Sequence, residues 1–167
     1  MVPSVFWIDA PDVGRLAVVA RPDPAYGLEH QMQSLRDAGV DTLVSLLAPH
    51  EAAMMGLAEE EAAAMAAGMA FDTLPTTDFA VPPSFAVAGR VIGRAAADLR
   101  AGRSVGAHCF AGRGRSPLFI AALLVHEGYA ASDAIDAVSA ARGRRVPETT
   151  AQCQWVADYA DWCRRNS

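Results

Sequence analysis

The chain is built around the segment His108-Cys109-Phe110-Ala111-Gly112-Arg113-Gly114-Arg115-Ser116. A short apolar run, Val105 to Ala107, precedes this segment, and Pro117 with an unbroken apolar stretch follows it. That order predicts a strand, a tight glycine-rich turn and a buried helix. Because five residues separate the cysteine from the arginine, the turn can wrap their backbone N–H groups around one point, which the helix N-terminus also faces. Such a nest of amides binds a tetrahedral dianion.

Two side chains of this segment complete the predicted anion site, which we call the cup (residues 109–115). Arg115 can hold two phosphate oxygens through its planar guanidinium. Cys109 is expected at the bottom of the cup, where the helix dipole and nearby cations favour the nucleophilic thiolate. The predicted phosphate-binding residues are those of the turn: Phe110, Ala111, Gly112, Arg113, Gly114 and Arg115.

The segment closely resembles the active-site loop of the protein tyrosine phosphatase superfamily, whose signature is Cys-x5-Arg-Ser. The resemblance fixes a His-Cys dipeptide, two glycines, an arginine and a hydroxyl at set spacings. It implies a cysteine-dependent phosphatase in which Cys109 attacks phosphorus and forms a phosphocysteine intermediate. In size and in the order of its elements, the chain is similar to the small dual-specificity phosphatases.

A general acid is expected beside the cup, because displacement of a phosphate ester by a thiolate leaves an alkoxide or a phenoxide. Asp78 is the predicted acid, since its proline-flanked loop is similar in placement to the acid loop of the family. An aspartate in such a loop can also be a simple turn residue. Asp72 is the alternative acid, although its position in a strand pattern makes it less mobile.

A later side chain is expected to hold the water that hydrolyses the phosphocysteine. The stretch from Pro147 to Gln152 resembles a Glu-Thr-x-x-Gln sequence of several small family members, which implies Gln152 for this role. Gln154 is the alternative. Taken without the resemblance, the stretch is a plain helix start capped by Thr149 or Thr150.

Four other residues near these motifs receive simpler predictions. Ser116 can donate a hydrogen bond to the thiolate, and it can also cap a helix that starts at Pro117. His108 is predicted to brace the loop, because a thiolate stabilised by amides needs no base. Cys153 and Cys163 are predicted to be inert helical core residues.

Composition narrows the possible functions of these 167 residues, which we expect to form a single domain, 1–167. Every basic residue apart from histidine is an arginine, which excludes a Walker-type phosphate loop and a lysine Schiff base. The net charge of −5 argues against a nucleic-acid partner. Arginines near the cup on an acidic chain suit a phosphorylated protein or a small phosphate monoester as substrate.

The cysteine and histidine patterns indicate the compartment and the absence of cofactors. Three cysteines without a CxxC pair favour a reducing compartment, so we expect the cytoplasm. The four histidines lack metal-ligand spacing, and no metal or other cofactor is expected. Neither a signal peptide nor an apolar run of ~20 residues is evident, so membrane insertion is not expected.

The chain alternates predicted strands with predicted helices, which favours an α/β fold of three layers with a central, mostly parallel sheet flanked by helices. Within it, Glu59-Glu60-Glu61 is predicted to be a solvated helix face, and Ser132 is a candidate helix cap. The predicted strands are Val5–Ile8, Leu16–Ala20, Thr42–Leu47, Ala70–Leu74 and Val105–Ala107. The predicted helices begin near residues 28, 51, 84, 118, 132 and 149, and the second of them runs unbroken from Glu51 to Ala67 before Gly68 ends it.

The substrate prediction is a phosphotyrosine or dual-specificity protein phosphatase. A chain this short leaves little sequence for the loops that deepen a phosphotyrosine-only pocket, so a shallow pocket walled near Phe79 and Phe110 is expected. The alternative is a phosphoinositide phosphatase, because a cation at the position of Arg113 resembles those enzymes. Two further alternatives are a rhodanese-like sulfurtransferase and an inactive phosphate-binding adaptor.

Overall fold

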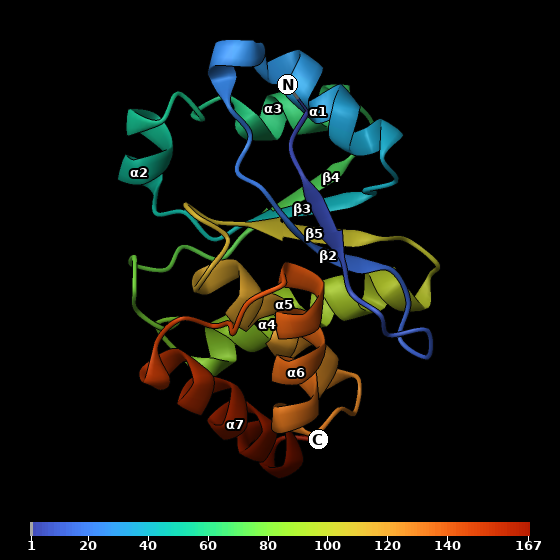
Figure 1. Ribbon diagram of the computed structural model, residues 1–167, viewed down its shortest axis with the longest axis vertical. Helices are drawn as coiled ribbons and strands as arrows, with labels where there is room; N and C mark the ends of the chain where they lie inside the picture. Colours follow the sequence, from blue (N-terminus) through green and yellow to red (C-terminus); the bar gives the residue numbers. More distant parts are fainter. Residues whose placement is uncertain (1) are drawn as a thin grey trace.

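The computed structural model describes residues 2–167, and its centre is a five-stranded sheet in the order β1-β2-β5-β3-β4 (Figure 1). Strands β2, β5, β3 and β4 are parallel, and β1 pairs antiparallel with β2 at one edge. The prediction of a mostly parallel sheet is thus confirmed. The strands are β1 (Val5–Trp7), β2 (Leu16–Val19), β3 (Thr42–Ser45), β4 (Ala70–Thr73) and β5 (Val105–His108).

Helices cover both faces of the sheet, which confirms the three-layer architecture (Figure 1). The first layer contains α1 (Leu28–Asp37), α2 (Pro49–Met54) and α3 (Glu60–Ala66), after a short 3-10 turn over Pro24–Tyr26. The second layer contains α4 (Phe85–Arg100), α5 (Arg115–His126), α6 (Ala131–Arg142) and α7 (Thr150–Arg165). No helix within residues 2–167 is long and apolar enough to cross a membrane.

The alternation of side chains along the strands divides the core between these layers. In β2, Leu16 and Val18 pack with the core around α4 to α7, whereas Ala17 and Val19 pack with the core around α1 and α3. Successive strand residues point to opposite faces of a sheet, so about half of the side chains of each buried strand pack against each helical layer. Helix α5 is the spine of the larger core, because every residue from 115 to 125 is buried.

Two helix predictions are wrong in detail. The predicted helix from Glu51 to Ala67 is two helices, because Gly56 adopts a left-handed φ of 71° and Leu57 turns into the core with 2% exposure. An alanine-rich composition favours helix at each position but does not show where burial of one side chain breaks it. Ser132 is not a cap either: α6 starts after Ala130, which has no side-chain cap hydrogen bond.

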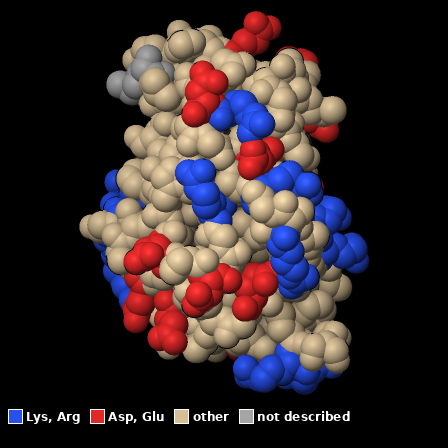
Figure 2. Space-filling model, turned by 90° about the vertical axis from the view of Figure 1, so that its right-hand side faces the viewer, with Lys and Arg blue, Asp and Glu red and all other residues tan. Residues whose placement is uncertain are grey.

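The central strand β5 places the cup. Its carboxyl end carries His108 and continues into the loop that leads to α5. The opposite side of the molecule, at the amino ends of the parallel strands, faces the viewer in Figure 2, where arginine side chains gather toward the right and acidic side chains toward the lower left. Ion pairs such as Arg103–Asp98 and Arg36–Asp41 lie at the amino ends of β5 and β3.

Candidate active site

The cup is the loop between the central strand β5 and the buried helix α5. Gly114 is the N-cap of α5, and Gly112 adopts a left-handed φ of 67°, which glycine takes without steric cost. The loop and the segment after β4 enclose a pocket of about 210 Å³. The residues that line it are Asp78, Phe79, Cys109, Phe110, Ala111, Arg113, Gly114, Arg115 and Glu148.

Cys109 and Ser116 meet at the base of this pocket. Cys109 is only 3% exposed, and its Sγ lies 3.1 Å from the Oγ of Ser116, which is fully buried in the first turn of α5. A hydroxyl at this distance can donate to a thiolate and stabilise it. The structure thus places Ser116 where the sequence predicted it, and the N-cap alternative is wrong because Gly114 is the cap.

Arg115 is fixed by acceptors from two other elements. Its Nη1 donates to Glu51 Oε1 at 2.7 Å and to the Thr76 carbonyl at 2.8 Å, and its Nη2 donates to Glu51 Oε2 at 3.1 Å. The side chain is 1% exposed. Burial, the largest single effect, acts to lower the pKa of Arg115. The hydrogen bonds that Arg115 donates to Glu51, together with the charges of Cys109, Glu51 and Asp78, outweigh burial and hold this pKa above its ordinary value.

Glu51 is a site residue that the sequence analysis missed. It lies on α2, and besides holding Arg115 its Oε1 accepts a hydrogen bond from the Ala48 N–H at 3.0 Å. The hydrogen bond from Arg115 holds the pKa of Glu51 below its ordinary value. The acidic residue at the start of a helix was visible in the sequence, but its arginine partner is 64 positions away.

Asp78 lies at the mouth of the pocket, directly above Arg115. One of its carboxylate oxygens is 3.2 Å from Arg115 Nη2 and also accepts from the Phe79 N–H at 3.0 Å. The side chain of Asp78 is 44% exposed, so it can reach a bound leaving group and solvent. Phe79 adopts a φ of 63°, a conformation that is uncommon for a residue other than glycine.

The alternative acid, Asp72, is held elsewhere. It lies on β4 and forms two hydrogen bonds with Arg94 of α4, at 2.8 and 3.1 Å. It does not line the pocket that contains Cys109. The geometry therefore favours Asp78 as the acid.

Gln152 joins the acid loop to the cup. It is fully buried; its Nε2 donates to the Ala80 carbonyl at 3.1 Å and its Oε1 accepts from the Thr149 N–H at 3.2 Å. Its amide also lies against Gly114, where an added Cβ would come within 2.8 Å of Nε2. The alternative, Gln154, is exposed on α7 and donates to Asp158. Thr149 caps α7, as the sequence allowed.

His108 holds the start of the loop in place by pairing with the buried side chain of Glu60. Its Nε2 pairs with Oε1 of Glu60, and both side chains are almost fully buried. Its Nδ1 lies 3.4 Å from the Cys109 carbonyl oxygen. The prediction that Glu59-Glu60-Glu61 is a solvated face is therefore wrong for Glu60, which is 3% exposed because α3 turns it toward β5. Glu59 and Glu61 are exposed as predicted.

Arginines surround the outer wall of the cup. Arg142 donates from Nε to the Gly112 carbonyl at 2.8 Å and stacks on the ring of Phe6. Burial, together with the nearby charges of Arg144 and Arg113, lowers the pKa of Arg142 below its ordinary value. Arg21 stacks on the ring of Phe110. The local surface is thus basic, as the sequence predicted.

A buried cysteine and arginine in a glycine-rich loop, with an aspartate above them, define a cysteine-based phosphatase of the dual-specificity type. A family model described as "Polymorphic toxin system, DSP-PTPase phosphatase" matches residues 18–129, more than half of the chain. The chain belongs to this family of phosphatases. The resemblance to the protein tyrosine phosphatase superfamily is confirmed, and the family favours phosphatase chemistry over a sulfurtransferase.

Solved structures agree in fold. The kinase associated phosphatase, with its catalytic-site cysteine substituted by serine, is 18% identical with a TM-score of 0.87, covering 98% of this chain and 97% of that chain. Tk-PTP in its active form is 24% identical with a TM-score of 0.76, covering 95% and 97%. PTPMT1 in complex with PI(5)P is 20% identical with a TM-score of 0.74, covering 90% and 93%. No curated protein sequence matches the chain significantly.

Proposed function

We propose that the enzyme hydrolyses phosphotyrosine, phosphoserine and phosphothreonine in proteins through a phosphocysteine on Cys109. The observation that carries this proposal is that Cys109, Arg115 and Asp78 line one pocket at successive depths. The thiol lies at its base, the guanidinium forms its wall, and the carboxylate at its mouth is 3.2 Å from that guanidinium.

In the first step, the phosphate dianion enters the cup and is held by Arg115 and the amides of residues 110–115. The Cys109 thiolate attacks phosphorus, so an S–P bond forms while the P–O bond to the leaving group breaks. Asp78 gives its proton to the departing oxygen. The fixed donors of the cup stabilise the charge on the transferred group, and this is the largest expected contribution.

In the second step, water attacks the phosphocysteine and the S–P bond breaks. Asp78, now a carboxylate, takes the proton from the water. The Ser116 hydroxyl, 3.1 Å from Sγ, stabilises the thiolate as it leaves. Gln152 lies between the Ala80 carbonyl and Gly114, and we assign it the positioning of this water against the cup wall.

Two aromatic side chains at the mouth support aryl phosphates as preferred substrates. Phe79 is 63% exposed and Phe110 is 48% exposed, and both line the pocket. Flat apolar faces beside the mouth can contact a phosphotyrosine ring. The side chain of Asp78 is 44% exposed at the mouth, so the proposed acid can also reach the leaving oxygen of a phosphoserine or phosphothreonine.

A phosphoinositide is the second candidate substrate. Arg113 lines the pocket, and the charges of Arg144 and Arg113 lie close enough to Arg142 to add to the lowering of its pKa by burial. A cluster of arginines attracts further phosphate groups on an inositol ring. The PTPMT1 structure, similar in fold, holds PI(5)P. We rank this second because Phe110 and Ala111 directly follow the nucleophile.

The test is a substrate panel without added metal, combined with acid quenching. Phosphotyrosine, phosphoserine and phosphothreonine peptides and PI(5)P are compared by phosphate release, and a 32P-labelled aryl phosphate is used to trap labelled enzyme. We expect labelled Cys109 and fastest turnover on phosphotyrosine. Faster turnover of PI(5)P would reverse the ranking. Sulfur transfer from thiosulfate without phosphate release would support a sulfurtransferase. Phosphate binding without turnover would support an inactive phosphate-binding adaptor.

We also propose a reducing compartment, such as the cytoplasm, as the place of action. All three cysteines of the chain are free, and the proposed thiolate must stay reduced to act.

A further inference from the structure

A second hollow lies beside the cup, at the same end of the sheet, where the parallel strands have their carboxyl ends. It encloses about 340 Å³ between the carboxyl ends of β3 and β4, marked by Ser45 and Thr73, and the two short helices α2 and α3. The cup follows the carboxyl end of β5, the neighbour of β3. In α/β sheets, ligands bind in the crevice outside the carboxyl ends of the strands. The hollow therefore lies where this fold places ligands, and no step proposed above uses it.

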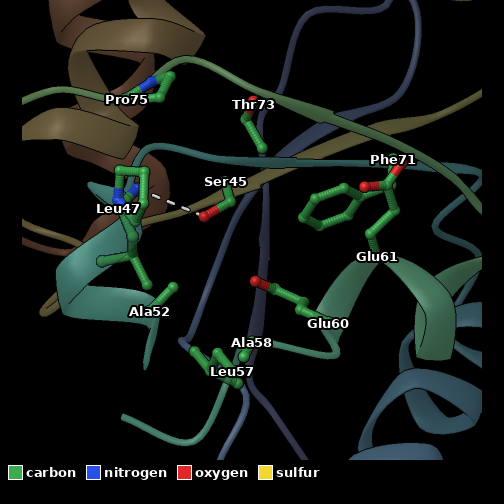
Figure 3. A pocket seen from close by; sticks show the side chains of 11 residues that line it. Ser45, Leu47, Ala52, Leu57, Ala58, Glu60, Glu61, Phe71, Thr73 and Pro75 are labelled. Carbon is green, nitrogen blue, oxygen red and sulfur yellow. Dashed lines mark hydrogen bonds between the residues drawn. The ribbon is translucent and has the colours of Figure 1, made fainter. Parts of the chain in front are cut away.

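The lining of the hollow selects for a cation with an apolar body. Figure 3 shows the carboxylate of Glu60 pointing into it, and Glu61 also lines it. Among the described residues that line the hollow, none is basic. Leu47 and Leu57 supply apolar walls, and Phe71 of β4 also lines the hollow (Figure 3). The Glu60 carboxylate is 3% exposed and already pairs through Oε1 with His108. A carboxylate in such a buried position attracts a further cation that enters the hollow beside it.

We propose that this hollow binds a small organic ammonium ion. Its ammonium group would donate to the Glu60 carboxylate, and its compact apolar body would pack against Leu47 and Leu57. The volume is at the lower end of the range for small-molecule pockets, ~300–1,000 Å³, which favours a small amine over a segment of another protein. This site goes beyond the phosphatase activity proposed above.

Residues on both walls of the hollow connect it to the catalytic cup. Glu60 pairs with His108, the residue before the nucleophile, and Ser45 is the register partner of His108 across β3 and β5. On the other wall, Ala52 of α2 lines the hollow next to Glu51, which holds Arg115. A ligand in the hollow thus contacts both helices that fix the cup, and its binding should alter the reactivity of Cys109.

The test compares 2-phenylethylamine with its neutral isostere, 2-phenylethanol. Both are titrated against the full chain by calorimetry at pH 7. The amine should bind at least about tenfold more tightly, and Glu60→Gln should remove that difference because it keeps the shape and removes the charge. The matched control is Glu59→Gln, an exposed neighbour that does not line the hollow, which should keep the preference.

A second variant keeps the proposal testable if Glu60→Gln does not fold. Ala52→Trp fills the hollow and should abolish amine binding while the circular dichroism spectrum stays native. The second readout is alkylation of Cys109 by iodoacetamide, whose rate should change at least about threefold with saturating amine and not with the alcohol. Equal binding of the two probes, no binding of the amine, a preference that survives in either variant, or an unchanged alkylation rate would overturn the proposal.

Discussion

The phosphate end and the substrate end of the active site differ sharply in exposure. At the phosphate end, Cys109, Arg115 and Ser116 are 3%, 1% and 0% exposed. At the substrate end, Phe79 and Phe110 are 63% and 48% exposed. Groups that stabilise charge act best when they are held in place before the reaction begins. The difference indicates that the core fixes the chemistry, while the exposed mouth sets which substrates can approach.

Cys109→Ser at the phosphate end should have the largest effect on catalysis. We expect phosphate release to fall to background, because a serine hydroxyl in this cup is neither a ready nucleophile nor a good leaving group from phosphorus. Oxyanion binding should persist, since Arg115 and the loop amides remain, and calorimetry with vanadate measures it. Cys153→Ser on α7, outside the pocket, is the control and should keep wild-type turnover. Turnover of an aryl phosphate by Cys109→Ser at the wild-type rate would refute the mechanism.

Asp78→Asn tests the exposed end. Loss of the acid should slow turnover by roughly 10²–10⁴-fold, because the leaving oxygen then departs without a proton. Substrates with very acidic leaving groups should lose less, since they need little protonation. Asp72→Asn is the matched control and breaks only the contact with Arg94. If Asp72→Asn shows this pattern and Asp78→Asn does not, the acid is misassigned.

Glu51→Gln loosens the buried end without removing a reacting group. Arg115 would lose its charged partner, so we expect kcat/KM to fall by about 10–100-fold and the free energy of unfolding by about 1–3 kcal/mol. Denaturant melts and steady-state kinetics measure the two effects. Glu59→Gln, which is exposed, should change neither. A variant with native kcat/KM would show that Thr76 alone positions the arginine.

The same variant has a defined pH dependence. Arg115 lowers the pKa of Glu51 below its ordinary value of 4.5. A carboxylate with a lowered folded-state pKa contributes stability that is fully present above the ordinary value and is lost as pH falls through the lowered pKa. The stability difference between wild type and Glu51→Gln should therefore be constant from pH 6 to 8 and shrink in acid below about pH 4.5.

The sequence predicted the cup because its parts lie in one strand, turn and helix. Cys109, Arg115 and Ser116 are close in the chain, so their geometry follows from local structure. Glu51 and Glu60 could not be predicted in the same way, because their partners lie 64 and 48 positions away and depend on the order of the strands. The burial of Glu60 also depends on the break at Gly56, which resets which face of α3 is buried.

Gln152 was predicted from the family resemblance and not from local structure. The family resemblance selected it from the stretch between Pro147 and Gln152, and the structure brings its buried amide against Gly114 and the acid loop. Its role with water depends on a bound intermediate, so it stays a prediction.

Arg113→Ala tests the outermost wall and should have the smallest effect. Arg113 is exposed and lines the pocket, and its charge is one of the causes that lower the pKa of Arg142. One exposed charge contact is worth at most about 1 kcal/mol, so turnover of aryl phosphates should fall less than about fivefold. A multiply charged substrate would engage the arginine cluster through additional phosphates and should lose more.

Kinetics on a phosphotyrosine peptide and on PI(5)P, measured side by side at two salt concentrations, give the comparison. A similar small loss on both substrates supports the protein substrate, because the mouth then contacts the ring rather than further phosphates. A far larger loss on PI(5)P, together with faster wild-type turnover of that lipid, would show that the basic rim and not the aromatic mouth selects the substrate.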